Sequence, residues 1–405
     1  MPNLRGNLLI GQSGGPTPVI NASLAGVLSE AKKMPEIEKI YGMKNGIDGA
    51  LKKEVYDLTQ EPDDLVNRLL YTPASALGSC RHKLSKNEEY EQLLELFRAN
   101  NIRYFVYIGG NDSMDTCHKI SMLALERNYD MLVIGVPKTI DNDLPITDHC
   151  PGFGSAARFI ALSTIESGRD LEAMNTFDDV AIYEIMGRHA GWLTAASALG
   201  KRCEEDAPHL VYLPERTFDE DQFLKDVKAV YDRLGYVYVA ISEGVRDKEG
   251  EFIGTGDTAT DAFGHKLISL GDGPAAYLAK LIMSKLGIKA RVNRPGTIQR
   301  AMASLASECD VEEAFRVGKA AVKYFAEGIS DVMVTLERLP LDEYKVEIGQ
   351  VPLSKVANVE KFMPDNFINA EGNFVTKEFY DYCLPLIGDA VPDYARLTKK
   401  SIILK

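Results

Sequence analysis

Short apolar runs alternate with longer amphipathic stretches along most of the chain. The apolar runs are rich in Val, Ile and Tyr, which is typical of strands. They predict strands at 7–11, 37–43, 104–110, 131–137, 180–186, 209–215, 236–242 and 332–338. Apolar residues spaced three or four positions apart predict helices at 88–101, 155–174, 219–235 and 311–328. Alternating strands and helices favour an α/β fold with mainly parallel sheets that helices cover on both faces.

The chain of 405 residues is long enough for two or three domains. The predicted strands could form one large sheet or two smaller ones. A Gly-rich segment, PGFGSAA at 151–157, is where we expect the chain to cross from one lobe to the other. Ligands of open α/β sheets bind beyond the carboxyl ends of the strands, so the loops at these ends are the candidates for function.

Composition indicates a soluble globular protein, with 45% apolar and 26% charged residues. No window approaches 18 apolar residues, and the N-terminus lacks the pattern of a secretory signal peptide. Six cysteines lie far apart without a CxxC pair, which favours free thiols and a cytoplasmic location.

The formal net charge of −13 disfavours nucleic acids and acidic membranes as partners. A polyanionic ligand would need a local cationic pocket. The segment KARVNRPGTIQR at 289–300 is one candidate, because it contains four cations and no acid. On the pattern alone, a solvated strand edge explains these charges as well as a ligand site does.

Two strand-end turns carry paired glycines. Gly14 and Gly15 follow the first predicted strand, and Gly109 and Gly110 follow the third. Glycine lets the backbone approach a ligand closely, and free amides at the start of a helix favour phosphate. Neither turn matches GxGxxG or a Walker A loop. The Asn-Asp-Ser after the second turn would also supply an ordinary helix N-cap through its Asp or Ser.

The loop GVPKTIDNDLP at 135–145 places Lys138, Thr139, Asp141 and Asp143 within six residues. If the loop is extended, the side chains of Asp141 and Asp143 point to the same side. Two close carboxylates beside a lysine could hold Mg²⁺ and accept a proton.

The segment EIMGRHAGWLTAA at 184–196 predicts a strand that passes through Met-Gly-Arg into a helix. Arg188 would then lie at the helix start, where its charge is unfavourable unless an anion binds there. For His189 a capping or packing role is favoured over metal binding, and the six histidines have no metal-ligand spacing. No GxSxG motif is present, which disfavours covalent hydrolase chemistry.

These motifs, in this order, resemble the 6-phosphofructokinase family. The resemblance rests on SGGPTPVINA, GSCR, GGNDS, PKTIDND, MGR, ISEG and GTIQR, and it spans nearly the whole chain up to about residue 300. It implies two Rossmann-like lobes with mainly parallel sheets sandwiched by helices and the active site in the cleft between them. The implied division has a phosphoryl-donor lobe at 1–150 plus roughly 299–345, a sugar-phosphate lobe at 151–298, and a C-terminal extension at 346–405.

The resemblance also implies roles for individual residues. Asp141 would be the general base on the sugar 1-hydroxyl, and Arg188 would stabilise the transferring phosphoryl group. Lys138 would be the third catalytic residue. Such roles fit phosphoryl transfer, which needs positioning, charge neutralisation and a base. The donor phosphates would be held by Gly14, Gly15, Arg81, Gly110, Asp112, Ser113 and Thr139. The sugar phosphate would be held by Thr139, Asp143, Met186, Gly187, Arg188, Glu243, Arg291 and Arg300. Mg²⁺ would be bound by Asp112, Asn111 and Asp141.

Asp112 and Lys138 would select the phosphoryl donor. ATP-using members of the family carry glycine in place of Asp112, and many carry glycine in place of Lys138. A carboxylate at position 112 would crowd and repel the α-phosphate of a nucleotide, and Lys138 would add positive charge beside a short polyphosphate. The chain therefore resembles the pyrophosphate-dependent branch, which transfers a phosphoryl group reversibly from pyrophosphate to fructose 6-phosphate with Mg²⁺.

Some positions depart from the ATP-type pattern. That pattern has aspartate at Asn111, and histidine is frequent at Thr297. Bacterial ATP-dependent members also place at Asp179 an arginine that reaches into the neighbouring subunit. In the C-terminal extension, a solvated surface is expected for Lys355 and Lys361 rather than a phosphate contact.

Alternative functions remain open at this stage. They are an ATP-dependent phosphofructokinase and a catalytically inactive regulatory subunit. NAD and lipid kinases share a Gly-Gly-Asp turn but not the other motifs, and a Rossmann dehydrogenase lacks its GxGxxG. A homodimer is the first expectation for the family, and sedoheptulose 7-phosphate is a conceivable second acceptor.

Overall fold

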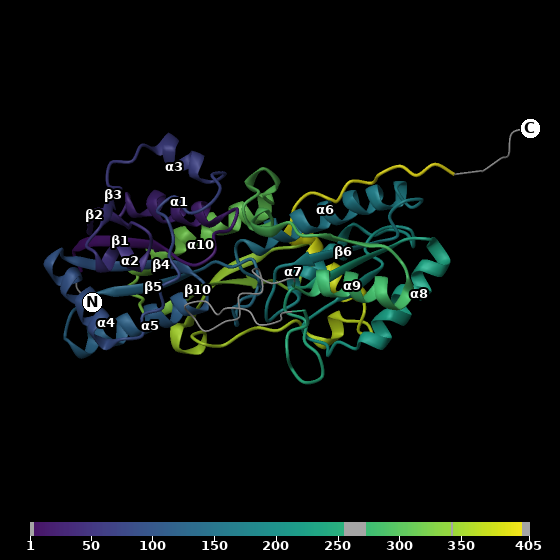
Figure 1. Cartoon of the computed structure of the whole chain (residues 1–405). Coiled ribbons are helices and arrows are strands. Elements are labelled where there is room, and N and C mark those ends of the chain that lie inside the picture. The colour runs from purple at the N-terminus through teal and green to yellow at the C-terminus, as the bar shows by residue number, and fades with distance from the viewer. Residues whose placement is uncertain (1–3, 255–272, 342, 399–405) are drawn as a thin grey trace, which may run out of the picture.

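The computed structural model describes residues 4–254, 273–341 and 343–398, and its strands form two sheets in two lobes. Figure 1 shows the first sheet on the left, among α1, α4 and α5, and the second on the right, among α6, α8 and α9. The first sheet has seven strands in the order β11-β10-β5-β4-β1-β2-β3, and the second has four in the order β7-β8-β6-β9. Neighbouring strands are parallel, except that β3 and β11 pair antiparallel at the two edges of the first sheet. The expected α/β architecture is confirmed.

The strands of the first sheet are β1 (Gly6–Gln12), β2 (Ile37–Met43), β3 (Val55–Asp57), β4 (Ile102–Gly109), β5 (Leu132–Pro137), β10 (Val332–Arg338) and β11 (Val346–Pro352). Those of the second are β6 (Val180–Ile185), β7 (Leu210–Tyr212), β8 (Val237–Ser242) and β9 (Ala290–Asn293). All eight predicted strands are present. The three that the pattern did not predict are β3, β9 and β11, which lie at sheet edges, where a half-exposed strand needs no continuous apolar run.

The helices around the first sheet are α1 (Ile20–Ala31), α2 (Ile47–Leu51), α3 (Asp63–Leu69), α4 (Asn87–Ala99), α5 (Asn111–Glu126) and α10 (Glu308–Ala326). Those of the second lobe are α6 (Phe153–Ala173), α7 (Trp192–Ala195), α8 (Glu220–Leu234), α9 (Gly273–Leu286) and α11 (Lys377–Cys383). In the described ranges, no helix is both long and apolar enough to cross a membrane.

Alternate residues of each central strand enter opposite cores, as the period of a strand requires. Leu8 and Ile10 of β1 pack with α1 and α10, whereas Leu9 between them packs with α4 and α5. The helices α1 and α10 approach closely at Gly26, where a Cβ would lie 2.1 Å from the carbonyl oxygen of Phe315. The strands are therefore buried on both faces, and their carboxyl ends are the accessible part of the sheet.

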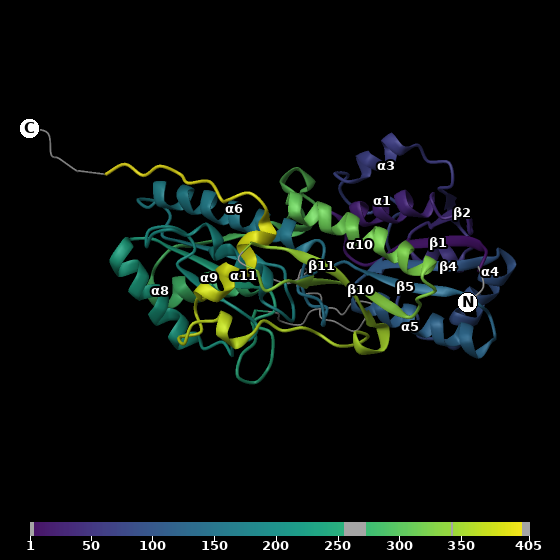
Figure 2. The same ribbon diagram turned by 180° about the vertical axis from the view of Figure 1, so that it is seen from behind.

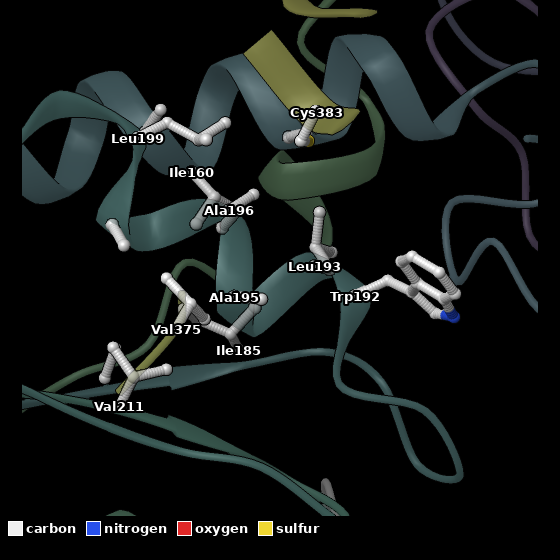
Figure 3. Packing of buried hydrophobic residues seen from close by; sticks show 14 of the residues in the cluster. Ile160, Ile185, Trp192, Leu193, Ala195, Ala196, Leu199, Val211, Val375 and Cys383 are labelled. Carbon is white, nitrogen blue, oxygen red and sulfur yellow. The ribbon is translucent and has the colours of Figure 1, made fainter. Parts of the chain in front are cut away.

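The C-terminal segment belongs to both lobes. Residues 346–352, expected in the extension, form β11 beside β10 of the first sheet. The chain then runs to α11 at the second lobe (Figure 2). There, Val375 and Cys383 join Ile160, Leu193 and Val211 in one buried cluster, which Figure 3 shows from close by. The extension is thus an integral part of the second core.

Candidate active site

Loops from both lobes meet at the carboxyl ends of β1, β4, β5, β6 and β8. The first-lobe loops are joined directly, since the backbone N–H of Lys138 donates to the carbonyl oxygen of Gly109 at 3.0 Å. Across the lobes, Asp141 interacts electrostatically with Glu243 and Arg188. The structure therefore brings together the ends of strands that lie in different sheets, as the sequence predicted.

Lys138 lies under the first glycine turn. Its ammonium donates to the carbonyl oxygen of Gly15 at 2.9 Å, and the side chain is only 4% exposed. A Cβ on Gly14, which has φ of 73°, would lie 3.3 Å from Lys138 Nζ, and one on Gly15 would lie 2.5 Å from Arg300 Nη1. The two glycines leave room for the cations beside the turn, and the positive φ of Gly14 favours glycine there. The turn is not a helix start, because α1 begins only at Ile20.

These cations form one pocket. Burial lowers the pKa of Lys138 to about 8, the nearby carboxylates of Asp141 and Asp143 oppose this, and Arg300 and Arg81 lower it further. Burial and the charge of Arg81 likewise lower the pKa of Arg300. Three cations thus lie close together, partly compensated by the carboxylates of Asp141 and Asp143, and such a group of cations suits a compact polyanion.

Asp141 follows Lys138 in a turned loop. The loop is not extended as expected, because Asn142 has φ of 54° and the Asp141 N–H donates to Thr139 Oγ1 at 3.0 Å. Asp141 and Asp143 nevertheless lie close enough to interact. Burial raises the pKa of Asp141 to about 7, the negative charges of Asp143 and Glu243 add to this, and Lys138 and Arg188 oppose it. A carboxylate poised near neutrality is suited to general base catalysis.

The second lobe supplies Met186, Gly187, Arg188 and Glu243. The expectation that Arg188 lies at a helix start is wrong, because α7 begins only at Trp192. Arg188 lies instead in the loop after β6, where its carbonyl oxygen would be 2.0 Å from a Cβ on Gly244. The N–H of Gly187 donates to Glu243 Oε1 at 3.5 Å, and the N–H of Met186 donates to the side chain of Gln299 at 3.0 Å.

Arg188 is available for an anionic ligand. Its Nε atom is buried and has no hydrogen-bond partner within the described part of the chain. The side chain lines a cavity of about 460 Å³, together with His189, Glu215, Arg246 and Met363. Burial raises the pKa of Glu243, and the charge of Arg188 opposes this. A half-buried guanidinium with an unused buried N–H donor is a suitable partner for a phosphoryl group.

Three predicted site residues have other partners. Asp112 pairs with Lys83, with 2.7 Å between Oδ1 and Nζ, and the side chains are 49% and 43% exposed. Arg291 donates to Asp178 and Asp170 at 2.7 and 2.8 Å. The amide of Asn111 binds the backbone at 358–359.

The second glycine turn also differs locally from the prediction. The helix α5 starts at Asn111, so its N-cap is Gly110 rather than Asp112 or Ser113. Ser113 is buried, and its Oγ atom lies against Gly109, where a Cβ would be 2.0 Å away. Asp112 is therefore in the first turn of α5, and its carboxylate is half-exposed.

The predicted Mg²⁺ ligands fit only in part. Asn111 does not fit, because both polar atoms of its side chain already bind the C-terminal segment. Asp112 and Asp141 supply the hard oxygen ligands that Mg²⁺ prefers, and the pair of Asp112 with Lys83 is exposed and easily exchanged. Within the residues that the structure describes, no three His, Cys, Asp or Glu side chains form a preformed metal cluster.

Two lysines at the site were not predicted. Lys83 is two residues beyond Arg81, and no local pattern marks it. Lys361 contacts the Asp141 loop, with its Nζ 3.3 Å from Asn142 Oδ1, so the expected solvated position is wrong. The expectation is confirmed for Lys355, which is exposed.

Comparisons with known proteins show the family. A family model described as phosphofructokinase matches residues 7–325. The chain is 44% identical to "Pyrophosphate--fructose 6-phosphate 1-phosphotransferase" of Xanthomonas campestris pv. campestris over 99% of the chain and 98% of that protein. It is 36% identical to "Sulfofructose kinase" of Alkalicoccus urumqiensis over 89% and 91%.

Among solved structures, the chain is similar to the pyrophosphate-dependent phosphofructokinase from Nitrosospira multiformis. The TM-score is 0.87 with 42% sequence identity, and the match covers 98% of this chain and 95% of that one. Both the sequence and the three-dimensional arrangement of the two lobes thus match over nearly the full length. The chain therefore belongs to the phosphofructokinase family.

Proposed function

We propose that the protein transfers a phosphoryl group reversibly between pyrophosphate and the 1-hydroxyl of fructose 6-phosphate. Family membership supports the reaction type, and the near full-length relatives that carry this activity in their names support the donor and acceptor. The observation that carries the choice of donor is the ammonium of Lys138, which fills the space under the Gly14–Gly15 turn beside Arg81 and Arg300. A short diphosphate suits this compact cationic pocket better than a nucleotide does.

In this proposal Asp141 accepts the proton of the 1-hydroxyl as its oxygen attacks the phosphoryl group. Arg188 neutralises the charge of the group in transfer, while Lys138 and Arg81 hold the phosphate that leaves. Glu243 binds sugar hydroxyls. Mg²⁺, held by Asp112 and Asp141, would neutralise charge on the diphosphate when bound.

The remaining phosphate contacts belong to the same proposal. Arg300 lies against Gly15 and interacts electrostatically with Glu243, which supports a role for it between the donor and the acceptor. Arg291 can reach the 6-phosphate only if that phosphate displaces Asp170 and Asp178 from its guanidinium. We also propose that the protein is a homodimer in the cytoplasm, as inferred from the sequence.

The reaction is tested in both directions with purified protein and Mg²⁺, followed by ³¹P NMR. Fructose 6-phosphate and pyrophosphate should give fructose 1,6-bisphosphate and phosphate, and the latter two should regenerate pyrophosphate. If fructose 1,6-bisphosphate forms only with ATP, the proposed donor is wrong. If neither donor gives product, the inactive regulatory subunit becomes the better explanation.

A second acceptor is suggested by the relative named sulfofructose kinase. A sulfonate carries one negative charge, whereas the 6-phosphate carries nearly two at neutral pH. The same assay with the 6-sulfonate of fructose, and with sedoheptulose 7-phosphate, compares kcat/KM for the three acceptors. We expect fructose 6-phosphate to have the highest value, and a higher value for the sulfonate would reassign the acceptor.

The pH dependence should be bell-shaped, with limbs near 7 and near 8. The base must be ionised, so activity falls as the pH drops through the raised pKa of Asp141, about 7. Lys138 must be protonated, so activity falls again as the pH rises through its lowered pKa, about 8. The profile of kcat/KM, which reports on the free enzyme, is the measurement. A flat profile between pH 6 and 9 would exclude both groups from catalysis.

A further inference from the structure

A stretch of the C-terminal segment, residues 356–363, crosses the site and contacts loops of both lobes. We call this stretch the strap. On the donor side, the Asn111 side chain binds the backbone of Asn358 and Val359. The amide of Asn358 also donates to Asp115 at 3.0 Å. The strap is therefore anchored to the first two turns of α5, directly after the second glycine turn.

On the acceptor side the strap holds the Asp141 loop. The backbone N–H of Lys361 donates to the carbonyl oxygen of Asp143 at 2.7 Å. The ammonium of Lys361 donates to Asn142 Oδ1 at 3.3 Å and to the carbonyl oxygens of Thr147 and Asp148 at 3.2 and 2.9 Å. All three protons of the ammonium thus have acceptors in the segment between β5 and α6, which carries the proposed base.

The second lobe fixes the strap from the other side. Trp192 Nε1 donates to the carbonyl oxygen of Lys361 at 3.3 Å, and the Lys361 ammonium lies 5.2 Å from the centre of the Trp192 ring. Trp192 lies at the edge of the second core with its indole nitrogen directed away from the other labelled side chains (Figure 3). Further along, the N–H of Met363 donates to Glu215 at 3.2 Å, and Glu215 also accepts from Gly191 at 2.8 Å.

The strap lies beyond residues 7–325, which match the family model, so the family domain alone does not supply these contacts. The Asp141 loop needs such support, because Asn142 adopts φ of 54° while fully buried. Without Lys361, the carbonyl oxygen of Thr147 would lose its ammonium donor, and Asn142 Oδ1 and the carbonyl oxygen of Asp148 would each keep one other donor, the Cys150 N–H and the Tyr382 hydroxyl.

We propose that Lys361 is a positioning residue for phosphoryl transfer, which holds the loop of Asp141 in its reactive place without touching the substrates. This inference rests on the proposed function only in assigning Asp141 as the base. The loop serves any donor, so the inference applies to transfer from pyrophosphate and from ATP alike. It predicts a defect in the chemical step rather than in substrate binding.

The test compares Lys361→Met with the wild-type protein in the assay with fructose 6-phosphate and pyrophosphate. A base displaced by about 1 Å can lose about a hundredfold in rate, so kcat should fall about a hundredfold. KM for both substrates should stay within about threefold, since positioning acts on the transition state. Lys361→Arg, which keeps a cation with several donors, should recover at least a tenth of the wild-type kcat. Lys355→Met, a change at an exposed lysine of the preceding turn, is the matched control and should be unaffected.

A kcat within threefold of wild type in folded Lys361→Met would overturn the inference. So would an increase in KM with unchanged kcat, which would make Lys361 a binding residue. If Lys361→Met does not fold, Lys361→Gln keeps two N–H donors and should still lower kcat more than tenfold at unchanged KM. A wild-type protein that is active only with ATP would refute the proposed donor, and the comparison of variants would then be made with ATP.

Discussion

Replacement of Asp141 by alanine should lower kcat by about 10²–10⁴-fold and leave the affinity for fructose 6-phosphate nearly unchanged. The surroundings of the carboxylate set its pKa near neutrality. Burial raises this pKa to about 7, and the positive charges of Lys138 and Arg188 oppose the rise. Without it, the proposed base is missing, and Asp143, the other carboxylate of the loop, is two residues further along. Steady-state kinetics gives kcat, and calorimetric titration with fructose 6-phosphate gives the affinity.

Two further variants sharpen this measurement. Asp141→Asn keeps the shape of the side chain and removes only the basic oxygen, so it should be impaired nearly as much as Asp141→Ala. Asp232→Ala changes an exposed, ion-paired aspartate on α8 and should have wild-type kinetics. A loss of less than about tenfold in folded Asp141→Ala would contradict the role of Asp141 as base.

The double replacement Asp112→Gly and Lys138→Gly should relax the choice of donor toward ATP. Lys138 fills the space beneath the first glycine turn, and Asp112 places a carboxylate in the first turn of α5. The double replacement removes both the cation and the carboxylate, and each 1.4 kcal/mol of preference changes the ratio of affinities tenfold. The ratio of kcat/KM for pyrophosphate to that for ATP should therefore fall on the order of a hundredfold.

Single variants separate the two effects. Lys138→Gly alone should weaken pyrophosphate use, because the donor pocket loses a cation that binds Gly15, while the carboxylate still repels a nucleotide. Asp112→Gly alone leaves Lys83 without its partner and should improve ATP use modestly. If the folded double variant shows no detectable turnover with ATP, donor selection lies elsewhere in the chain.

The sequence predicted the strands and the strand-end loops of this site well, because local sequence patterns mark both. Apolar runs rich in β-branched residues mark the central strands, and the polar loops that follow them are necessarily at one edge of each sheet. Lys138, Asp141, Arg188, Glu243 and Arg300 lie at such loop ends and meet across the two lobes. The sequence also showed the two glycine turns. It did not show that Lys138 and Arg300, which come from other loops, lie beside Gly14 and Gly15.

Contacts between distant segments could not be predicted in this way. The sequence predicts that Asn111 lies at a helix start, but it does not show that its side chain binds the backbone of Asn358 and Val359, far along the chain. The local sequence shows no acid near Arg291, but the carboxylates of Asp170 in α6 and Asp178 before β6 form ion pairs with its guanidinium. Lys361 has the surroundings of a surface lysine in sequence, and only the packing of the strap against Trp192 buries it. Each of these depends on tertiary packing rather than on local pattern.

The central claim is the choice of pyrophosphate as donor, and the most direct test is kcat/KM for pyrophosphate and for ATP. Purified wild-type protein, saturating fructose 6-phosphate and Mg²⁺ are used, with each donor alone. We predict a value for pyrophosphate at least about a hundredfold above that for ATP, in line with the repulsion expected from one carboxylate. An equal or higher value for ATP would contradict the account of Asp112 and Lys138 while leaving the family membership intact.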